Sequence, residues 1–222
     1  MSPRSIVQKA YETGLHIIAV TDHNMAENGL YAYELGKEYG ITVLCGMELQ
    51  TLEEIHLLAV FDKYDTAFDF QKIIYDLLPD VPNDIEFFGD QVVVNTENEI
   101  VRSEGRLLLN SAQIPIDNAV NLIKSKGGIA IPSHIDSPMF SIISQLGFVP
   151  DNIPFDALEV RHIEKAHDLS SLIMQKNIPL VSFSDAHYIT DIGRKRTILE
   201  MNEPTCHEIA KALQIMGAAR CG

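Results

Sequence analysis

Ile17-Ile18-Ala19-Val20-Thr21-Asp22-His23-Asn24 is the stretch of sequence that decides the fold. Its first half is a continuous apolar run, mostly of β-branched residues, which is typical of a strand buried on both faces. Its second half brings together a hydroxyl, a carboxylate, an imidazole and an amide. In α/β proteins, functional side chains collect at the carboxyl ends of such strands. The stretch therefore predicts a strand over 17–20 that leads directly into part of a functional site.

Similar apolar runs recur along the chain and alternate with helical patterns. Strands are expected over 41–45, 55–61, 129–132, 155–160, 178–183 and, more weakly, 197–201. Helices are expected over 1–11, 27–39, 66–78, 116–126, 141–146, 165–176 and 205–216. Repeated strand-then-helix units predict a parallel α/β architecture, either barrel-like or open.

Residues 62–111 interrupt this alternation. They contain one helical pattern, an acidic Pro-rich loop at 79–84 and a predicted β-hairpin over 91–101. We interpret this segment as an insertion that carries no chemistry of its own, within a single domain spanning residues 1–222.

Composition limits the class of protein. The chain has 222 residues, 46% of them hydrophobic and 22% charged, which is ordinary for a globular protein with one substantial core. A net charge of −14 argues against a nucleic-acid surface built on bulk positive charge, although bound divalent cations would still admit an anionic substrate. No apolar run reaches the roughly 18 residues of a membrane span, and the start lacks a signal-peptide pattern. Three cysteines without CxxC spacing predict free thiols and a cytoplasmic location.

Histidines and carboxylates gather at or near the ends of the predicted strands. The candidates are Asp22, His23, Glu48, His56, His134, Asp136, Asp185 and His187. Taken singly, each has an ordinary interpretation, since an Asp before a helix is usually a cap and a strand histidine is usually a satisfied core residue. Taken together, imidazoles and carboxylates on five strands suit zinc, manganese or iron, because such groups rarely tolerate unpaired burial. The conjunction favours a metal site.

Four motifs resemble those of the PHP (polymerase and histidinol phosphatase) domain family. They are Thr-Asp-His-Asn at 21–24, Gly-Met-Glu at 46–48 with Ile-His-Leu-Leu at 55–58, Pro-Ser-His at 132–134, and Ser-Asp-Ala-His at 184–187. Each motif alone is weakly specific, but four in order cover most of the chain. The resemblance implies a distorted (β/α)7 TIM-like barrel with up to three metal ions at its carboxyl end, hydrolysing phosphoesters.

The resemblance also implies metal ligands, position by position. Glu48 would bridge two ions, His56 and His134 would complete one of them, and Asp185 would belong to its neighbour. A third ion would be held by His23 and by His187.

The chain departs from the family pattern at its start. Such domains open with a strand ending in Asp-Leu-His-x-His-Ser, whereas here a helix-like Met1-Ser2-Pro3 stands before the Thr21-Asp22-His23 motif. We therefore expect the first strand to be missing and fewer than three ions to be bound. The exposed sheet edge left by a missing strand would favour a homo-oligomer.

The implied function is hydrolysis of a small phosphorylated substrate by a metal-activated water. Asp22 is the candidate catalytic residue, orienting a ligand or the water, with a helix cap as its alternative role. Arg161 and Arg194 are candidate substrate-binding residues, although a solvated loop explains the basic run at 194–196 equally well. The main alternative is a non-catalytic PHP-like regulatory or interaction module with incomplete metal sites, and a nuclease is the second alternative.

Overall fold

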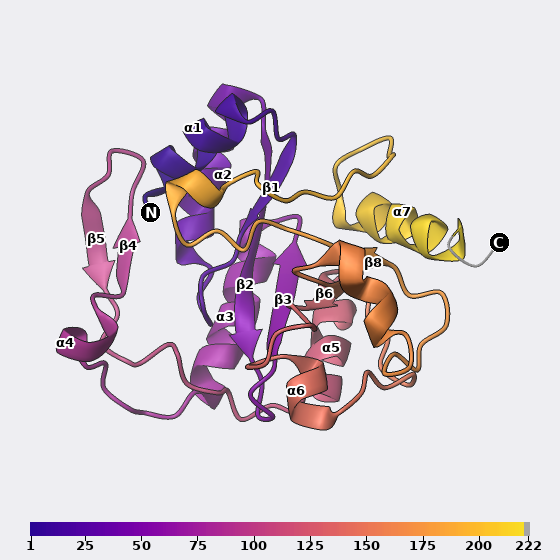
Figure 1. Ribbon diagram of the computed structural model, residues 1–222. Helices are drawn as coiled ribbons and strands as arrows, with labels where there is room; N and C mark the ends of the chain where they lie inside the picture. Colours follow the sequence, from indigo (N-terminus) through magenta and orange to yellow (C-terminus); the bar gives the residue numbers. More distant parts are fainter. Residues whose placement is uncertain (220–222) are drawn as a thin grey trace.

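A four-stranded sheet forms the centre of the protein, whose computed structural model describes residues 1–219 (Figure 1). Its strands, in spatial order, are β1 (Ile17–Val20), β2 (Thr42–Gln50), β3 (His56–Phe61) and β6 (Ile129–Pro132). β1 and β2 run parallel, as expected, but β3 is antiparallel to both β2 and β6. The expected all-parallel sheet is therefore wrong at β3. Residues 51–55 are too few to make the crossover that a parallel connection needs, so the chain turns straight back.

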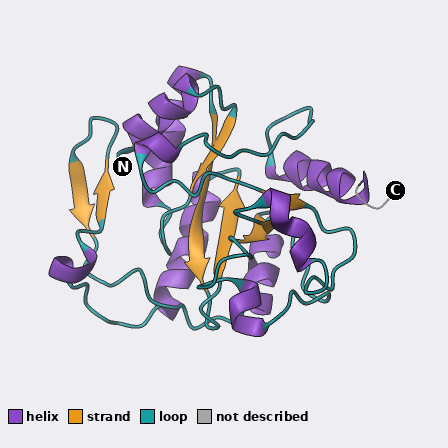
Figure 2. Ribbon diagram, viewed as in Figure 1, coloured by secondary structure: helices purple, strands orange, loops and turns teal. Residues whose placement is uncertain are grey.

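Two smaller sheets accompany the central one. The hairpin of β4 (Val92–Val94) and β5 (Ile100–Ser103) confirms the antiparallel pair expected inside residues 62–111. β7 (Leu158–Glu159) and β8 (Leu180–Val181) pair in parallel. The strands of residues 1–219 do not close into a barrel, and the hairpin stands apart from the central sheet (Figure 2). The fold is α/β.

Seven α-helices and two short 3-10 helices lie within the described residues. They are α1 (Pro3–Glu12), α2 (Glu27–Tyr39), α3 (Tyr64–Leu77), α4 (Ile85–Phe88), α5 (Ile116–Ser125), α6 (Ile142–Leu146), η1 (Ile163–Leu169), η2 (Ile189–Asp191) and α7 (Cys206–Ala219). The expected start of α1 is confirmed, because the Ser2 side chain accepts a hydrogen bond from Ser5 N and Pro3 occupies the first helical turn. Gly40 ends α2 in the left-handed conformation, at φ 67°.

Two expected elements are absent from the described structure. The helix expected over 165–176 is only the 3-10 helix η1 followed by turns. The successive Ser170 and Ser171 belong to a residue type that favours turns over helix interiors. The strand expected over 197–201 is a loop. Thr197 Oγ1 both accepts from Ser182 N and donates to Ser182 O, at 3.0 Å each, so a side chain takes the bonds that a pairing strand would have made.

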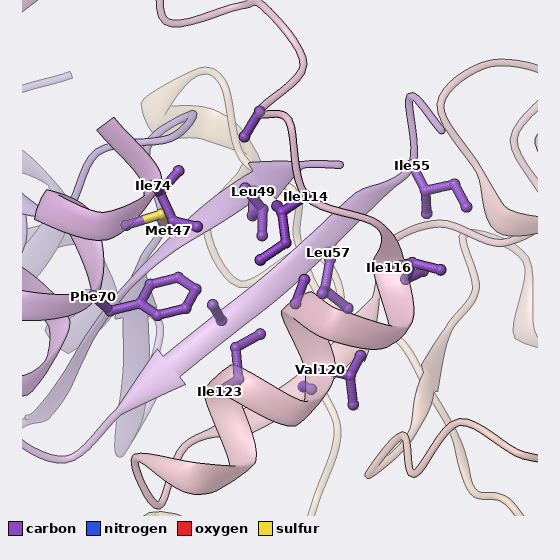
Figure 3. Close-up of a cluster of buried hydrophobic side chains, with 14 of the residues drawn as sticks. Met47, Leu49, Ile55, Leu57, Phe70, Ile74, Ile114, Ile116, Val120 and Ile123 are labelled. Carbon is purple, nitrogen blue, oxygen red and sulfur yellow. The ribbon is translucent and has the colours of Figure 1, made fainter. Parts of the chain in front are cut away.

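One face of the central sheet carries the main apolar core. Side chains alternate along a strand, so Met47 and Leu49 of β2 share this face with Leu57 of β3. Figure 3 shows these residues packed against α3 and α5, and the side chains it labels are Met47, Leu49, Ile55, Leu57, Phe70, Ile74, Ile114, Ile116, Val120 and Ile123. Burial of each large side chain contributes about 2 kcal/mol. This core fixes the two strands on which the candidate site is built.

The opposite face is apolar at one end and polar at the other. Leu44 and Val60 lie in a second buried cluster with Leu213 of α7. The same alternation brings Glu48, Gln50 and His56 onto this face, farther along β2 and at the start of β3. The polar end of this face is therefore available to form a site.

Two further expectations can be compared with the structure. Cys45 and Cys206 are buried free thiols, as expected, while Cys221 lies outside the described residues. None of the helices in residues 1–219 is both long enough and apolar enough to cross a membrane.

Candidate metal centre

Backbone pairing brings the candidate ligands of four segments together. His23 follows β1 and forms a parallel bridge with Glu48 of β2. Gln50 of β2 lies opposite His56, the first residue of β3. His56 O accepts a hydrogen bond from Ser133 N, the residue after β6, and His134 follows directly. Because β3 is antiparallel, its first residue lies at the same end of the sheet as the last residues of its neighbours.

Glu48 is the centre of this cluster. Its Oε2 atom lies 3.5 Å from Nδ1 of His23 and 3.5 Å from Nδ1 of His56. Its other oxygen, Oε1, lies 3.7 Å from Nε2 of His134. The His56 ring stands 5.1 Å from the His23 ring and 5.3 Å from the His134 ring, measured between centroids. One buried carboxylate therefore faces three imidazoles.

These groups fit a divalent metal ion. Nδ1 of His23 and Nδ1 of His56 are buried and have no hydrogen-bond partner. One ligand atom from each of His23, Glu48 and His56 can be chosen so that all three lie within 4.8 Å of one another. Metal–ligand bonds of about 2.1 Å place neighbouring ligand atoms roughly 3 to 3.5 Å apart, which is close to the 3.5 Å between Glu48 Oε2 and each of the two imidazole nitrogens. Nitrogen and oxygen donors without thiolate suit zinc, manganese or iron.

The charge states also suit metal binding. Burial lowers the pKa of His23 and of His134 more than the nearby Glu48 carboxylate raises it, so both rings are neutral near pH 7 and keep a lone pair. Burial opposes ionisation of Glu48, but the nearby imidazoles of His56 and His23 favour its charged form and lower the Glu48 pKa to about 2. The cluster therefore offers one anion and neutral imidazoles, as a metal requires.

Asp22 supports the cluster from beside His23. Its Oδ2 atom accepts a hydrogen bond of 2.8 Å from Asn28 Nδ2. Burial raises the Asp22 pKa, against the opposing effect of that hydrogen bond. The alternative role as cap of α2 is wrong, because the N-cap position is Ala26.

The segment 62–111 contacts the loop that carries His23. Asn24 Nδ2 donates to the carbonyls of Leu108 and Asn110, at 2.7 and 2.9 Å. Asn28, besides binding Asp22, accepts a 2.9 Å hydrogen bond from Val94 N of the hairpin. The segment 62–111 contributes no side chain to the cluster around Glu48. Its hydrogen bonds instead fix Asn24 and Asn28, which lie close to His23 in the sequence.

Asp185 and His187 lie near enough to the cluster for their charges to act on it, since Asp185 raises the pKa of His134 and His187 lowers that of His23. Asp185 has a positive φ of 43°, and its Oδ2 atom is 3.4 Å from Arg161 Nη2. The His187 ring is 67% exposed, and its Nδ1 atom is 3.7 Å from Asp185 Oδ1. Arg194 lies in an exposed loop, where its Nη1 atom is 2.7 Å from Asp191 Oδ1.

Glu159 has no role in the sequence-based prediction, although a carboxylate inside the apolar run 155–160 could have drawn attention to it. It is 3% exposed. Its Oε2 atom accepts from His134 N at 3.2 Å, and its carbonyl accepts from Ile135 N at 2.8 Å. These bonds support His134, which has a φ of 32°. Asp136, by contrast, uses both carboxylate oxygens on the backbone N–H groups of 161 and 162.

Glu159 is expected to make stability depend on pH. Burial raises its pKa from 4.5 to about 7, so its contribution to folding is present below pH 4.5 and is lost as the pH rises through 7. At about 1.4 kcal/mol for each pH unit, the loss approaches about 3 kcal/mol. The free energy of unfolding of the metal-free wild-type protein would be measured with urea from pH 4.5 to pH 8, beside that of Glu159→Gln. We expect the wild-type value to fall over this range by about 3 kcal/mol more than the value of the variant.

The comparison with Glu159→Gln isolates this effect, because His23 and His134 titrate in both proteins. A difference between the two free energies that stays constant from pH 4.5 to pH 8 would contradict the assignment.

Comparisons with known proteins identify the family of the chain. A family model described as the PHP domain matches residues 1–146. The match spans more than half of the chain, and the chain belongs to the PHP domain family. In addition, 51 residues are 39% identical to an uncharacterized protein of Methanocaldococcus jannaschii, covering 23% of this chain and 30% of that protein.

Solved structures share the fold at low sequence identity. A lesion-specific endonuclease from Pyrococcus furiosus superposes with a TM-score of 0.65 at 18% identity, covering 96% of this chain and 51% of the endonuclease. This chain thus spans about half the length of that protein. A protein described as a metal-dependent phosphoesterase, from Bifidobacterium adolescentis, gives a TM-score of 0.57 at 16% identity, with 97% and 91% covered. An amidohydrolase from Chromobacterium violaceum gives 0.56 at 15% identity, with 97% and 92% covered.

Proposed function

We propose that the protein is a metal-dependent phosphoesterase whose divalent ion is held by Glu48, His23, His56 and His134. The observation that carries the proposal is the Glu48 carboxylate, 3.5 Å from two imidazole nitrogens that are buried and have no other partner. Two such nitrogens facing one buried carboxylate are costly unless a further group satisfies them. Membership of the PHP family supports the same interpretation.

The metal and the protein would divide the chemistry. A bound zinc, manganese or iron ion supplies Lewis acidity, which activates water and neutralises charge on phosphoryl oxygens. Glu48 contributes the negative charge that retains the cation, and the neutral rings of His23 and His134 contribute lone pairs. Asp22, anchored by Asn28, is the residue we assign to orienting the water or a ligand.

Asp185 and His187 complete the proposed ligand set. Asp185 lies close enough for its charge to raise the pKa of His134, and the charge of His187 lowers that of His23. We propose that these residues serve a second ion beside the first. The strand arrangement supports an open form of the distorted PHP barrel, with the sheet of β1, β2, β3 and β6 and the pair of β7 and β8 as its two arcs.

Arg161 is the residue we assign to binding the substrate phosphate, with Arg194 as a more distant cation. Arg161 is next to Asp185, and its charge lowers the pKa of His134, so it lies beside the cluster. The net charge of −14 favours a small phosphorylated substrate over nucleic acid. The fold likeness to the Pyrococcus furiosus endonuclease makes a nuclease the second candidate.

Hydrolysis assays test the proposal. The protein would be stripped with EDTA, reloaded with Mn²⁺ or Zn²⁺, and supplied with p-nitrophenyl phosphate, bis-p-nitrophenyl phosphate or an abasic DNA duplex. We expect turnover of a nitrophenyl ester only after metal is restored. Cleavage of DNA alone would support the nuclease, while metal-dependent turnover of none of the three would overturn the proposed activity.

Replacing Arg161 with alanine is expected to raise the KM for a phosphoester about tenfold, because a charge-assisted hydrogen bond to phosphate is lost. Steady-state kinetics of Arg161→Ala would be compared with those of Lys211→Ala, which removes an exposed cation that pairs with Glu208 on α7. Equal KM values for the two variants would remove Arg161 from substrate binding.

A further inference from the structure

The environment of the His56 ring differs on its three sides. One face stacks on Phe140, with 4.8 Å between ring centroids and an interplanar angle of 5°. Nδ1 points toward Glu48 Oε2 at 3.5 Å and has no hydrogen-bond partner. Nε2, on the other side of the ring, lies 3.3 Å from Gln50 Oε1. The ring is therefore held in one orientation, with a different polar group facing each nitrogen.

Gln50 determines which nitrogen of His56 carries the proton. An amide oxygen only accepts hydrogen bonds, so the contact requires Nε2 of His56 to be the donor. In a neutral imidazole the other nitrogen, Nδ1, then has a free lone pair. That lone pair faces Glu48, at the position where a metal ligand is needed. The opposite tautomer would set the lone pair of Nε2 against that of Gln50 Oε1, with no proton between them, and would direct the Nδ1 proton into the cluster.

Gln50 is itself fixed from several directions. Its Nε2 atom donates to Ser111 Oγ at 2.9 Å, which leaves the amide oxygen facing His56. Its backbone N donates to Asn24 Oδ1 at 3.0 Å, and its carbonyl accepts from Ala112 N at 2.9 Å. The side chain is buried, with Gln50 7% exposed. Ser111 is the last residue of the segment 62–111. Through its hydrogen bond with Gln50, this segment therefore helps to fix the His56 ring.

We propose that Gln50 is a positioning residue that holds His56 in its Nε2–H tautomer and so presents Nδ1 as a metal ligand. The inference rests on the proposed metal centre and adds to it a residue outside the ligand set. Groups that accept the second N–H of a metal-binding histidine typically change metal affinity by about 10- to 100-fold when removed. The sequence motifs around Glu48 and His56 give no role to Gln50.

The histidine tautomer can be measured without metal. In ¹⁵N-labelled, EDTA-treated wild-type protein, long-range ¹H–¹⁵N spectra report which nitrogen of His56 is protonated, and we expect Nε2–H. Gln50→Leu removes the acceptor at similar size and is expected to yield a mixture of tautomers, with Mn²⁺ or Zn²⁺ affinity about 10- to 100-fold weaker by calorimetry. Gln50→Glu keeps an acceptor and is expected to restore the Nε2–H form and wild-type or tighter affinity.

Gln71→Leu is a matched control for stability. Gln71 is also a buried glutamine, and its side chain accepts from Ala26 N and donates to Glu27, away from the imidazoles. The Gln71→Leu variant should therefore leave the His56 tautomer and the metal affinity unchanged.

Two results would overturn the role of Gln50. One is a wild-type His56 protonated on Nδ1, which does not depend on any variant folding. The other is an unchanged tautomer and affinity in Gln50→Leu. A wild-type protein with Nε2–H on His56 but no metal binding at all would instead overturn the proposed metal centre, so the two failures are distinguishable.

Discussion

Glu48→Gln is expected to lower metal-dependent turnover by at least about 10³-fold, which corresponds to about 4 kcal/mol of transition-state stabilisation. Glutamine matches glutamate in size but removes the negative charge that lies within 3.7 Å of three imidazoles. The cluster then offers only neutral donors and retains a divalent cation poorly. Turnover of a nitrophenyl ester and metal binding by calorimetry would both be measured.

Glu53→Gln is the matched control for this change. Glu53 lies just beyond β2, where its carboxylate accepts from Thr51 Oγ1 and from Ile116 N at the start of α5. The variant loses the same charge close by in the sequence, yet we expect turnover close to that of the wild type. Turnover of Glu48→Gln within tenfold of that of Glu53→Gln would contradict the central role of Glu48.

Gly46→Ala is expected to lower the free energy of unfolding by about 3 kcal/mol. Gly46 lies on β2, two residues before Glu48 and on the same face of the sheet. A Cβ atom there would overlap the carbonyl oxygen of Ala59 and lie 3.0 Å from the Cα of Val60 on β3. Because these are backbone atoms, the two strands must separate, and Glu48 and His56 then move apart. Urea unfolding and metal titration would record both effects.

Gly105→Ala provides the comparison, since a Cβ atom at Gly105 meets no atom within 4 Å. We expect its unfolding free energy to stay within about 1 kcal/mol of the wild-type value. If Gly46→Ala were as stable as Gly105→Ala, the close approach of β2 and β3 beside the cluster would be refuted.

Local sequence pattern was sufficient to place several candidate ligands near one another. The apolar run before Asp22 and His23 predicted the strand that brings His23 to Glu48, and the run 129–132 predicted the strand that leads to His134. The position of His56 required one more step. Its strand begins rather than ends at the site, and only the short connection at 51–55 indicates this reversal.

The supporting residues could not be predicted in the same way. Asn24 and Gln50 find their partners at residues 108–111, more than 60 positions along the chain. Such contacts depend on how the segment 62–111 packs, which no local periodicity encodes. The strand expected over 197–201 failed for a related reason, because the Thr197 side chain takes the backbone hydrogen bonds of Ser182, the residue after β8.

Anomalous X-ray diffraction from crystals grown with Mn²⁺ or Zn²⁺ tests the central claim most directly, because it locates the ion irrespective of substrate. The account predicts an anomalous peak bonded to Glu48 and to at least two of His23, His56 and His134. A protein that shows metal-dependent hydrolysis while its only anomalous peaks lie away from Glu48 would contradict it.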